Sequence, residues 1–321
     1  MRGLIAACAT CGLLLAGCGS DDDETAGAKP TTGASQVVAA TYTPTSDVSS
    51  NAAIGKDVAA IRALLAPEGA GAKPDFDAAA EIWSKGKSST KSDGTNRTLA
   101  EWVAKHPAGA GVADALAGTG TAKDLTEEGR VEWIDKGMVV SLAAHALDEF
   151  NGAKEKLAAG ELDPQEGTIH NVDEVWAYFD AEGEGVVATA AKRAKDFGLA
   201  QSALGGAVIA GITAAQAAVN AKDAAGLDAA AESTRGAMNR IFALAVKKYA
   251  VEGADDPKAR AEGFAFSWGL HGQLAKADLA SIQAAFADDA PANAATSVAE
   301  TLDAAAPKLG FEAPLPPYSG S

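Results

Sequence analysis

The chain has few of the side chains on which most enzymes and redox proteins depend. Its 321 residues include only three cysteines and four histidines, and aromatic residues make up 6% of them. It contains no nucleophile elbow, no phosphate-binding glycine loop and no His-Glu-x-x-His zinc motif. The common hydrolase arrangements therefore have little material, and we expect a protein that is not an enzyme.

Basic residues are also in short supply. The 27 Lys and Arg face 43 Asp and Glu, which gives a formal net charge of -16 at pH 7. A surface this acidic repels phosphate backbones and anionic lipid headgroups. We therefore expect no nucleic-acid partner, whereas the acid excess suits solubility, cation binding or both.

All three cysteines lie at the N-terminus, in a segment typical of bacterial lipoproteins. Met1 and Arg2 precede a short apolar run that ends in Leu15-Ala16-Gly17-Cys18, and this run is too short to span a bilayer as a helix. The pattern predicts cleavage before Cys18 and lipidation of its thiol, so the mature chain keeps no free cysteine. Because Gly19 rather than an aspartate follows, we expect a lipid-anchored protein on the periplasmic face of the outer membrane or at the cell surface.

Composition divides the chain into four parts. Residues 1–17 form the signal peptide, and residues 18–50 form an acidic tether rich in Thr, Ser, Ala and Pro that has too little apolar surface to fold. Residues 51–310 form one domain, and residues 311–321 form a C-terminal tail. The membrane is thus a predicted partner through the N-terminal lipid, with the tether holding the domain away from it.

Within the domain, apolar residues recur at helical spacing, and no segment alternates as a strand would. Ile54, Val58 and Ile61 mark one predicted helix. Thr126 is a suitable N-cap for a long helix that runs to about Ala159. We expect an all-α fold, a multi-helix bundle with a long buried central helix. The predicted helices lie at about 54–65, 75–85, 99–104, 126–159, from 171 onward, 183–200, 203–220, 224–250, 255–270, 276–287 and 293–306, and the Gly- and Ala-rich segment 106–121 is expected to be a loop.

The first candidate site is on the long helix. His145 is followed by Asp148 and Glu149, and these offsets place the three side chains on one helical face. The helix is apolar nearly all round, so an imidazole and a carboxylate on it need partners. Metal ligation and an ordinary polar pair both satisfy this need, and the sequence leaves them open. Three acids upstream could add ligands or simply complement the helix dipole: Glu128, Glu132 and Asp135.

Two further segments carry candidate ligands. His170 stands just before the helix predicted from Asn171, and Asp173 and Glu174 lie in its first turn. The alternative is that Asn171 caps the helix and the two acids complement its dipole. Glu262 precedes an aromatic stretch, where it could be a ligand or could pair with Lys258 four residues earlier. The remaining histidines, His106 and His271, have no acidic neighbour on the same face and are expected to be structural or exposed.

Several of these segments, taken in order, resemble a known family. The match lies in Ala80–Ser89, Arg97-Thr98-Leu99, Lys136-Gly137 and the helix that follows it, His170–Tyr178, and Glu262–Phe266. The segment His-Asn-Val-Asp-Glu-Val-Trp-Ala-Tyr at 170–178 is the strongest part. The chain resembles the Fe-assimilating, low-iron- and high-carbon-dioxide-inducible periplasmic protein family, which has bacterial lipoprotein relatives.

The resemblance implies an extracytoplasmic helical protein that binds iron and passes it to a metal transporter. It favours a metal site formed by the following residues: His145, Glu149, His170, Asp173, Glu174 and Glu262. Oxygen ligands favour ferric iron, whereas two or more histidines would also admit zinc or copper. Two alternatives remain, a scaffold lipoprotein that binds no metal and a helical enzyme similar to the imelysin-like peptidases.

Overall fold

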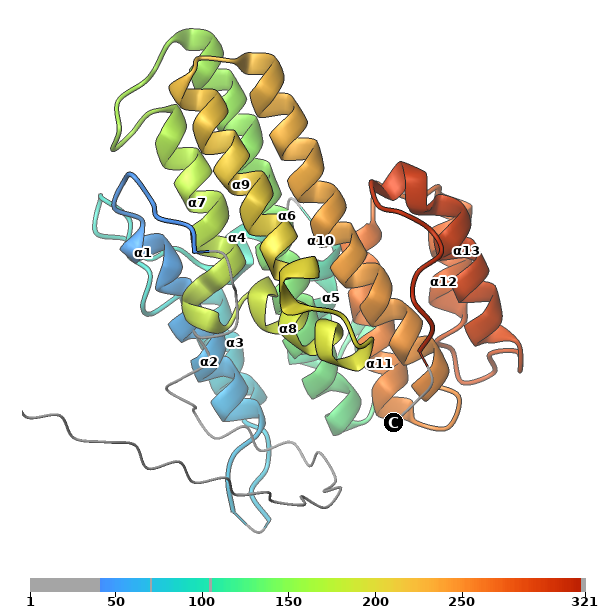
Figure 1. The fold of residues 1–321 in the computed structure, drawn as a ribbon. Helices are drawn as coiled ribbons and strands as arrows, with labels where there is room; N and C mark the ends of the chain where they lie inside the picture. Colours follow the sequence, from blue (N-terminus) through green and yellow to red (C-terminus); the bar gives the residue numbers. More distant parts are fainter. Residues whose placement is uncertain (1–40, 70, 104–105, 319–321) are drawn as a thin grey trace, which may run out of the picture.

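A computed structural model describes residues 41–69, 71–103 and 106–318 of the chain (Figure 1). Over these ranges the chain is helical and forms no strand, and its one extended pairing is an isolated antiparallel bridge between Thr90 and Asn96. The predicted all-α class is therefore confirmed. None of the helices in these ranges is long and apolar enough to cross a membrane. The predicted signal peptide, Cys18 and most of the tether lie outside the described residues.

Two long helices, α6 (Glu127–Ala159) and α10 (Ala224–Glu252), run through the middle of the bundle (Figure 1). α6 begins where the sequence predicts, because the Thr126 hydroxyl accepts a hydrogen bond from the Gly129 N–H at 3.0 Å. It ends at Gly160, whose φ of 76° is left-handed and suits glycine. Apolar side chains on several sides of α6 are buried, which confirms the predicted long central helix.

Shorter helices surround these two. α6 packs against α5 (Pro107–Ala117), α7 (Thr168–Asp180) and α11 (Pro257–Ser267), whereas α10 packs against α9 (Gly205–Asn220), α11 and α13 (Ala294–Leu309). α12 and α13 lie on the far side of α10 from α7 (Figure 1). The other α-helices are α1 (Ser49–Ala52), α2 (Ile54–Leu65), α3 (Phe76–Lys85), α4 (Leu99–Val103), α8 (Val186–Asp196) and α12 (Lys276–Ala284).

The segment expected to be a loop at 106–121 is mostly helical, so that prediction is wrong. Pro107 occupies the first turn of α5, where a missing N–H costs nothing, and Gly118 ends the helix with a φ of 65°. Gly111 allows α5 to approach α6, because a Cβ there would lie 2.6 Å from Trp133 Nε1. The glycines that suggest a loop in the sequence thus serve close packing and helix termination.

The helix predicted from Asn171 begins earlier, at Thr168. Gly167 occupies its N-cap position, and the Thr168 hydroxyl donates to the Glu161 carbonyl at 2.8 Å. Asn171 does not cap this helix, because its side-chain amide donates to Glu149 on α6 at 2.6 Å. His170 therefore lies inside α7 rather than before it.

Candidate functional site

α6 and α7 pack together, and their facing surfaces carry most of the candidate residues. His145 and Glu149 lie one turn apart on α6, and His170, Glu174 and Tyr178 follow at one-turn intervals on α7. A pocket of about 290 Å³, here called the Glu149–Glu174 pocket, opens beside them. Its lining consists of Lys91, Arg97, Glu101, Trp102, His145, Glu149, Glu174 and Tyr178. The structure thus brings three of the predicted ligands, His145, Glu149 and Glu174, into one pocket.

The carboxyl groups of Glu149 and Glu174 line the same pocket, and each lies within the electrostatic reach of the other. The Asn171 side-chain amide donates to Glu149 Oε2, and the Asn51 side-chain amide donates to Glu174 Oε1, each at 2.6 Å. Burial and the neighbouring Glu149 carboxylate raise the pKa of Glu174 to about 8. At neutral pH the Glu174 carboxyl group therefore holds its proton.

The His145 ring packs in a cluster with the rings of Trp102 and Tyr178, which also contact each other. It stacks on Trp102 with the ring centroids 4.1 Å apart, and its centroid is 4.6 Å from that of Tyr178. Its Nε2 atom lies 3.5 Å from Glu149 Oε1, so these two side chains share a face, as their spacing predicts. Asp148, expected on the same face, instead lines a different cavity between α6 and α10.

His170 is next to the pocket but does not line it. Its Nε2 atom lies 3.6 Å from Glu174 Oε1, and its Nδ1 atom lies 3.0 Å from Ser46 Oγ. Burial and the nearby Lys156 lower the pKa of His170. The neutral imidazole that this favours at pH 7 keeps a lone pair that could coordinate a metal.

Asp173 is fully buried and anchors the segment before α1 rather than facing the pocket. Its carboxylate accepts hydrogen bonds from the Tyr42 hydroxyl at 2.5 Å and from the Thr45 N–H at 2.9 Å. The Ser46 N–H and hydroxyl each donate to it at 2.7 Å. Both oxygens are thus occupied by donors from a segment that the sequence assigned to the tether, and the ordered contacts of the domain begin by residue 42.

Glu262 lies on α11, in a separate cluster of charged side chains beside the N-terminal half of α6. Lys136 pairs with Glu262 and with Glu132 at 3.0 Å each, and Lys258 pairs with Glu132 at 3.1 Å rather than with Glu262. Burial raises the pKa of Glu262 to about 7, in spite of the nearby Lys136. The structure therefore does not bring Glu262 to the Glu149–Glu174 pocket.

The other acids that precede His145 on α6 do not line the pocket either. Glu128 is exposed at the start of the helix. Asp135 pairs with Arg62 of α2 and with Lys136, each at 2.6 Å. The position of Glu128 at the start of the helix and the ion pairs of Asp135 explain why these two acids are present without a metal ion.

Sequence reasoning missed several residues that shape the pocket. Asn51, Trp102 and Arg97 come from segments far from α6 and α7, and nothing in their local sequence indicates the contact. Tyr178 could have been found, because it follows Glu174 by four residues and His170 by eight. A helix that begins at Asn171 leaves His170 outside it, so its alignment with Glu174 and Tyr178 cannot be read from that prediction.

A family model for the low iron-inducible periplasmic proteins matches residues 12–251. The chain belongs to this family. The matched range of this low iron-inducible periplasmic protein includes the whole lining of the Glu149–Glu174 pocket, whereas Glu262 and His271 lie beyond it. No curated protein and no solved structure gives a significant match.

The pocket of this low iron-inducible periplasmic protein is not a preformed metal centre. Over the part of the chain that the structure describes, no three His, Cys, Asp or Glu side chains are arranged to hold a metal ion. Two amides, Asn51 and Asn171, instead take up one carboxylate oxygen each. The pocket combines a carboxyl pair, an imidazole and two flanking cations, Lys91 and Arg97.

Proposed function

We propose that this protein binds iron as its cargo in the Glu149–Glu174 pocket and passes it to a transporter. The observation that carries the proposal is the carboxyl pair of Glu149 and Glu174, held together beside the His145 ring in a pocket that is open to solvent. Membership of a low iron-inducible periplasmic family supports the choice of iron. In this proposal the protein binds and releases its cargo without turnover.

Electrostatics explains why a cation would bind between these carboxyl groups. Two neighbouring carboxylates repel each other, and here burial together with this repulsion keeps a proton on Glu174. A multivalent cation removes the repulsion and displaces that proton. Carboxylate oxygens suit ferric iron, and the imidazoles of His145 and His170 would also admit zinc or copper.

Binding would require only small movements of the side chains. Donor atoms that share one ion at about 2.1 Å lie roughly 3 Å from each other. His145 Nε2 is 3.5 Å from Glu149 Oε1, and His170 Nε2 is 3.6 Å from Glu174 Oε1. Small rotations of these side chains, which move the donor atoms by a few tenths of an ångström, would bring the two atoms of either pair to about 3 Å from each other.

The test is iron titration of the lipid-free protein from residue 41 onward, prepared without an affinity tag. We expect stoichiometric iron binding and a higher melting temperature with metal, because a ligand that binds only the folded state must stabilise it. The double variant Glu149→Gln/Glu174→Gln should lose binding by at least about 100-fold, or about 2.7 kcal/mol. Glu128→Gln, an exposed change on the same helix, should bind as the parent protein does.

The opposite result would favour the scaffold alternative. If the folded protein takes up no iron, zinc or copper, it is not a metal-binding protein. If instead the double variant binds metal as the parent does, the protein binds metal at a site other than this pocket. The variant His145→Ala is a second test, because it removes the imidazole but leaves the carboxyl groups of Glu149 and Glu174 in place. Retained iron binding in this variant, at lower affinity, would identify the carboxyl pair as the principal ligand.

We also propose that the protein is attached to a membrane through a lipid on Cys18. The motif Leu15-Ala16-Gly17-Cys18 supports this attachment. The expected result is that the full-length chain fractionates with membranes and that Cys18→Ser is released into the soluble periplasmic fraction. Equal partition of the two proteins would contradict the proposal.

A further inference from the structure

The Ser46 hydroxyl group lies between the buried Asp173 carboxylate and the His170 ring. Its oxygen is 2.7 Å from Asp173 Oδ2 and 3.0 Å from His170 Nδ1. Ser46 belongs to the segment before α1, whereas Asp173 and His170 lie on α7. A hydroxyl group has a single proton and can donate it to only one of these two neighbours. The neighbour that receives it decides which nitrogen of His170 carries the proton of the ring.

The Ser46 hydroxyl donates to Asp173. The backbone N–H groups of Thr45 and Ser46 donate to the same carboxylate oxygen at 2.9 Å and 2.7 Å, so this oxygen acts as an acceptor. Without a proton between them, the hydroxyl and carboxylate oxygens would face each other with lone pairs only, 2.7 Å apart in a buried site. A hydrogen bond to a carboxylate is also stronger than one to a neutral acceptor.

His170 therefore donates a hydrogen bond to Ser46 rather than accepting one. Burial and the nearby Lys156 lower the pKa of His170, so the ring is neutral at pH 7 and carries one proton. Because the Ser46 proton is directed at Asp173, the Ser46 oxygen offers only lone pairs to the ring, and the proton of the ring lies on Nδ1. The separation of 3.0 Å is typical of an N–H···O bond. His170 Nε2 then carries the lone pair.

This lone pair lies next to the Glu149–Glu174 pocket. His170 Nε2 is 3.6 Å from Glu174 Oε1, the same oxygen that accepts from Asn51. The opposite tautomer would place an N–H group at this position, and a protonated nitrogen cannot coordinate a metal ion. In metal sites, a carboxylate, carbonyl group or water commonly holds the far nitrogen of a ligating histidine and fixes its tautomer.

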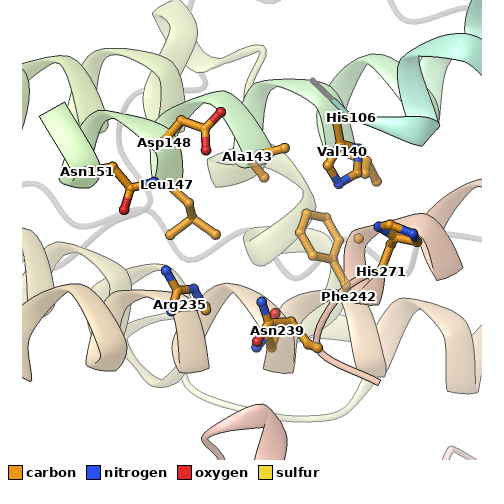
Figure 2. A pocket seen from close by; sticks show the side chains of 13 residues that line it. His106, Val140, Ala143, Leu147, Asp148, Asn151, Arg235, Asn239, Phe242 and His271 are labelled. Carbon is orange, nitrogen blue, oxygen red and sulfur yellow. The ribbon is translucent and has the colours of Figure 1, made fainter. Parts of the chain in front are cut away.

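His106 provides a contrast within the same protein. It lies with His271 at one end of a second cavity, of about 160 Å³, between α6 and α10 (Figure 2). We call it the α6–α10 cavity, and none of its lining residues lines the Glu149–Glu174 pocket. His106 Nδ1 accepts from the Ala108 N–H at 3.3 Å, and burial together with the nearby His271 lowers the pKa of His106 to about 4. The neutral His106 ring thus carries its proton on Nε2, the opposite tautomer to that of His170.

We propose that Ser46, itself held by Asp173, is a positioning residue that fixes the proton of His170 on Nδ1 and thereby makes His170 Nε2 a ligand for the metal in the Glu149–Glu174 pocket. The tautomer follows from the hydrogen bonds alone, whereas the ligand role rests on the proposed binding of iron. Because Ser46 precedes α1, the segment that leads into the domain then contributes to the metal site as well as to the fold.

The first measurement is ¹⁵N NMR of the histidine rings in the metal-free protein at pH 7, prepared without a histidine tag. We expect a protonated Nδ1 and an unprotonated Nε2 for His170, and the reverse for His106 in the same spectrum. Ser46→Ala removes the acceptor of the His170 proton but keeps the backbone hydrogen bond to Asp173. His170 should then lose its preference for the proton on Nδ1, while His106 stays unchanged. Ser46→Thr keeps the hydroxyl group and should keep the tautomer.

Iron titration of the same proteins tests the ligand role. Ser46→Ala should bind iron at least roughly tenfold more weakly than the parent, or about 1.4 kcal/mol, because groups that orient a ligating histidine typically contribute roughly 10- to 100-fold to metal affinity. Ser46→Thr should bind as the parent does. The control is Thr45→Ala, which removes an exposed hydroxyl group from the same segment and should change neither the tautomer nor the affinity.

The two measurements separate the possible failures. A proton on Nε2 of His170 in the metal-free parent, or an unchanged tautomer in Ser46→Ala, would overturn the positioning role of Ser46. The expected tautomers together with equal iron affinity of the parent and Ser46→Ala would overturn the ligand role of His170. If the parent takes up no iron, the proposed function fails and the ligand role of His170 fails with it. The spectrum of the metal-free protein then still decides the role of Ser46.

Discussion

At the scale of single residues, two adjacent acids of α7 have opposite surroundings. Asp173 is surrounded by hydrogen-bond donors, and its two oxygens hold the segment that leads into α1. Glu174 is half-buried near the carboxyl group of Glu149, and its burial together with this neighbour raises its pKa. The charged Asp173 carboxylate stabilises the fold through these hydrogen bonds, whereas the surroundings of Glu174 favour its neutral, protonated form. Cation binding therefore suits Glu174 much better than Asp173.

The raised pKa of Glu174 predicts how stability depends on pH. The pKa of Glu174 is about 8 in the folded state, against an ordinary value of 4.5. At pH values between these two, the carboxyl group is protonated in the folded protein and ionised in the unfolded chain. The free energy of unfolding should therefore fall as the pH rises from about 5 to about 8, by at most about 1.4 kcal/mol per unit from this site. Glu174→Gln should flatten this slope and raise the stability at about pH 8.

The measurement is urea denaturation of both proteins at several pH values. Because Glu262 also has a raised pKa, only the difference between the parent and the variant reports on Glu174. The exposed Glu155→Gln is the control and should leave the slope unchanged. Parallel curves for the parent and Glu174→Gln would show that the pKa of Glu174 is not raised in the folded state.

Asp173→Ala should destabilise the fold rather than act on the pocket alone. It removes the acceptor for four donor groups of segment 42–46, and hydrogen bonds to a charged group contribute about 1.5–3 kcal/mol each before relaxation. We expect a loss of about 3 kcal/mol and faster hydrogen exchange at the Thr45 and Ser46 N–H groups. Unchanged exchange at these two groups would contradict the anchoring role.

At the scale of helices, the sequence predicts those elements whose ends carry local signals. The Thr126 cap and Gly160 mark both ends of α6, and α2 also lies where its apolar spacing places it. The prediction fails for α5, because a glycine used for close packing looks the same in sequence as a glycine in a loop. It also fails at the start of α7, where Asn171 has the residue type of a cap but bonds to Glu149 on another helix.

The same limit applies to the candidate site. The spacing of His145 and Glu149 correctly predicts a shared face, because both residues lie on one helix. The meeting of Glu149 with Glu174, and of both with Asn51, depends on how α1, α6 and α7 pack. No local sequence pattern encodes this packing. The candidate ligands can therefore be predicted from the sequence, but which of them lie in one pocket cannot.

Gly111 gives a direct test of the close approach between α5 and α6. A Cβ at this position would lie 2.6 Å from Trp133 Nε1 and 3.0 Å from two carbons of the same buried ring. Gly111→Val should therefore cost about 1–3 kcal/mol of stability through overpacking. Ala110→Val, on an exposed side of the same helix, should cost less than about 1 kcal/mol and is the control in urea denaturation. Equal losses in the two variants would mean that the contact with Trp133 is not limiting.

At the scale of the whole molecule, α6 connects three groups of polar residues that are otherwise separate. Its N-terminal half carries the charged cluster of Glu132, Asp135 and Lys136, which reaches α2 and α11. Its C-terminal half lines both the Glu149–Glu174 pocket and the α6–α10 cavity. The family match ends at residue 251, before α11, so the pocket belongs entirely to the matched part and the partner of Lys136 on α11 does not.

Lys136→Met separates the structural role of the charged cluster from metal binding. Lys136 is largely buried and pairs with Glu132, Asp135 and Glu262. Its loss removes the cation beside Glu262 and one of the two cations beside each of the other carboxylates. We expect a destabilisation of about 3–5 kcal/mol near neutral pH. The loss should be smaller at about pH 5, because Glu262, with a pKa of about 7, is then protonated and needs no partner.

Iron binding by the same variant decides whether Glu262 contributes to the site. If the Glu149–Glu174 pocket is the site, folded Lys136→Met should bind iron with the affinity of the parent, because no residue of the charged cluster lines that pocket. The titration should be done at a temperature where the variant is fully folded by circular dichroism. A folded variant that loses iron would instead connect the charged cluster to the metal. Glu262 would then return as a candidate ligand, and the proposed site would have to extend along α6.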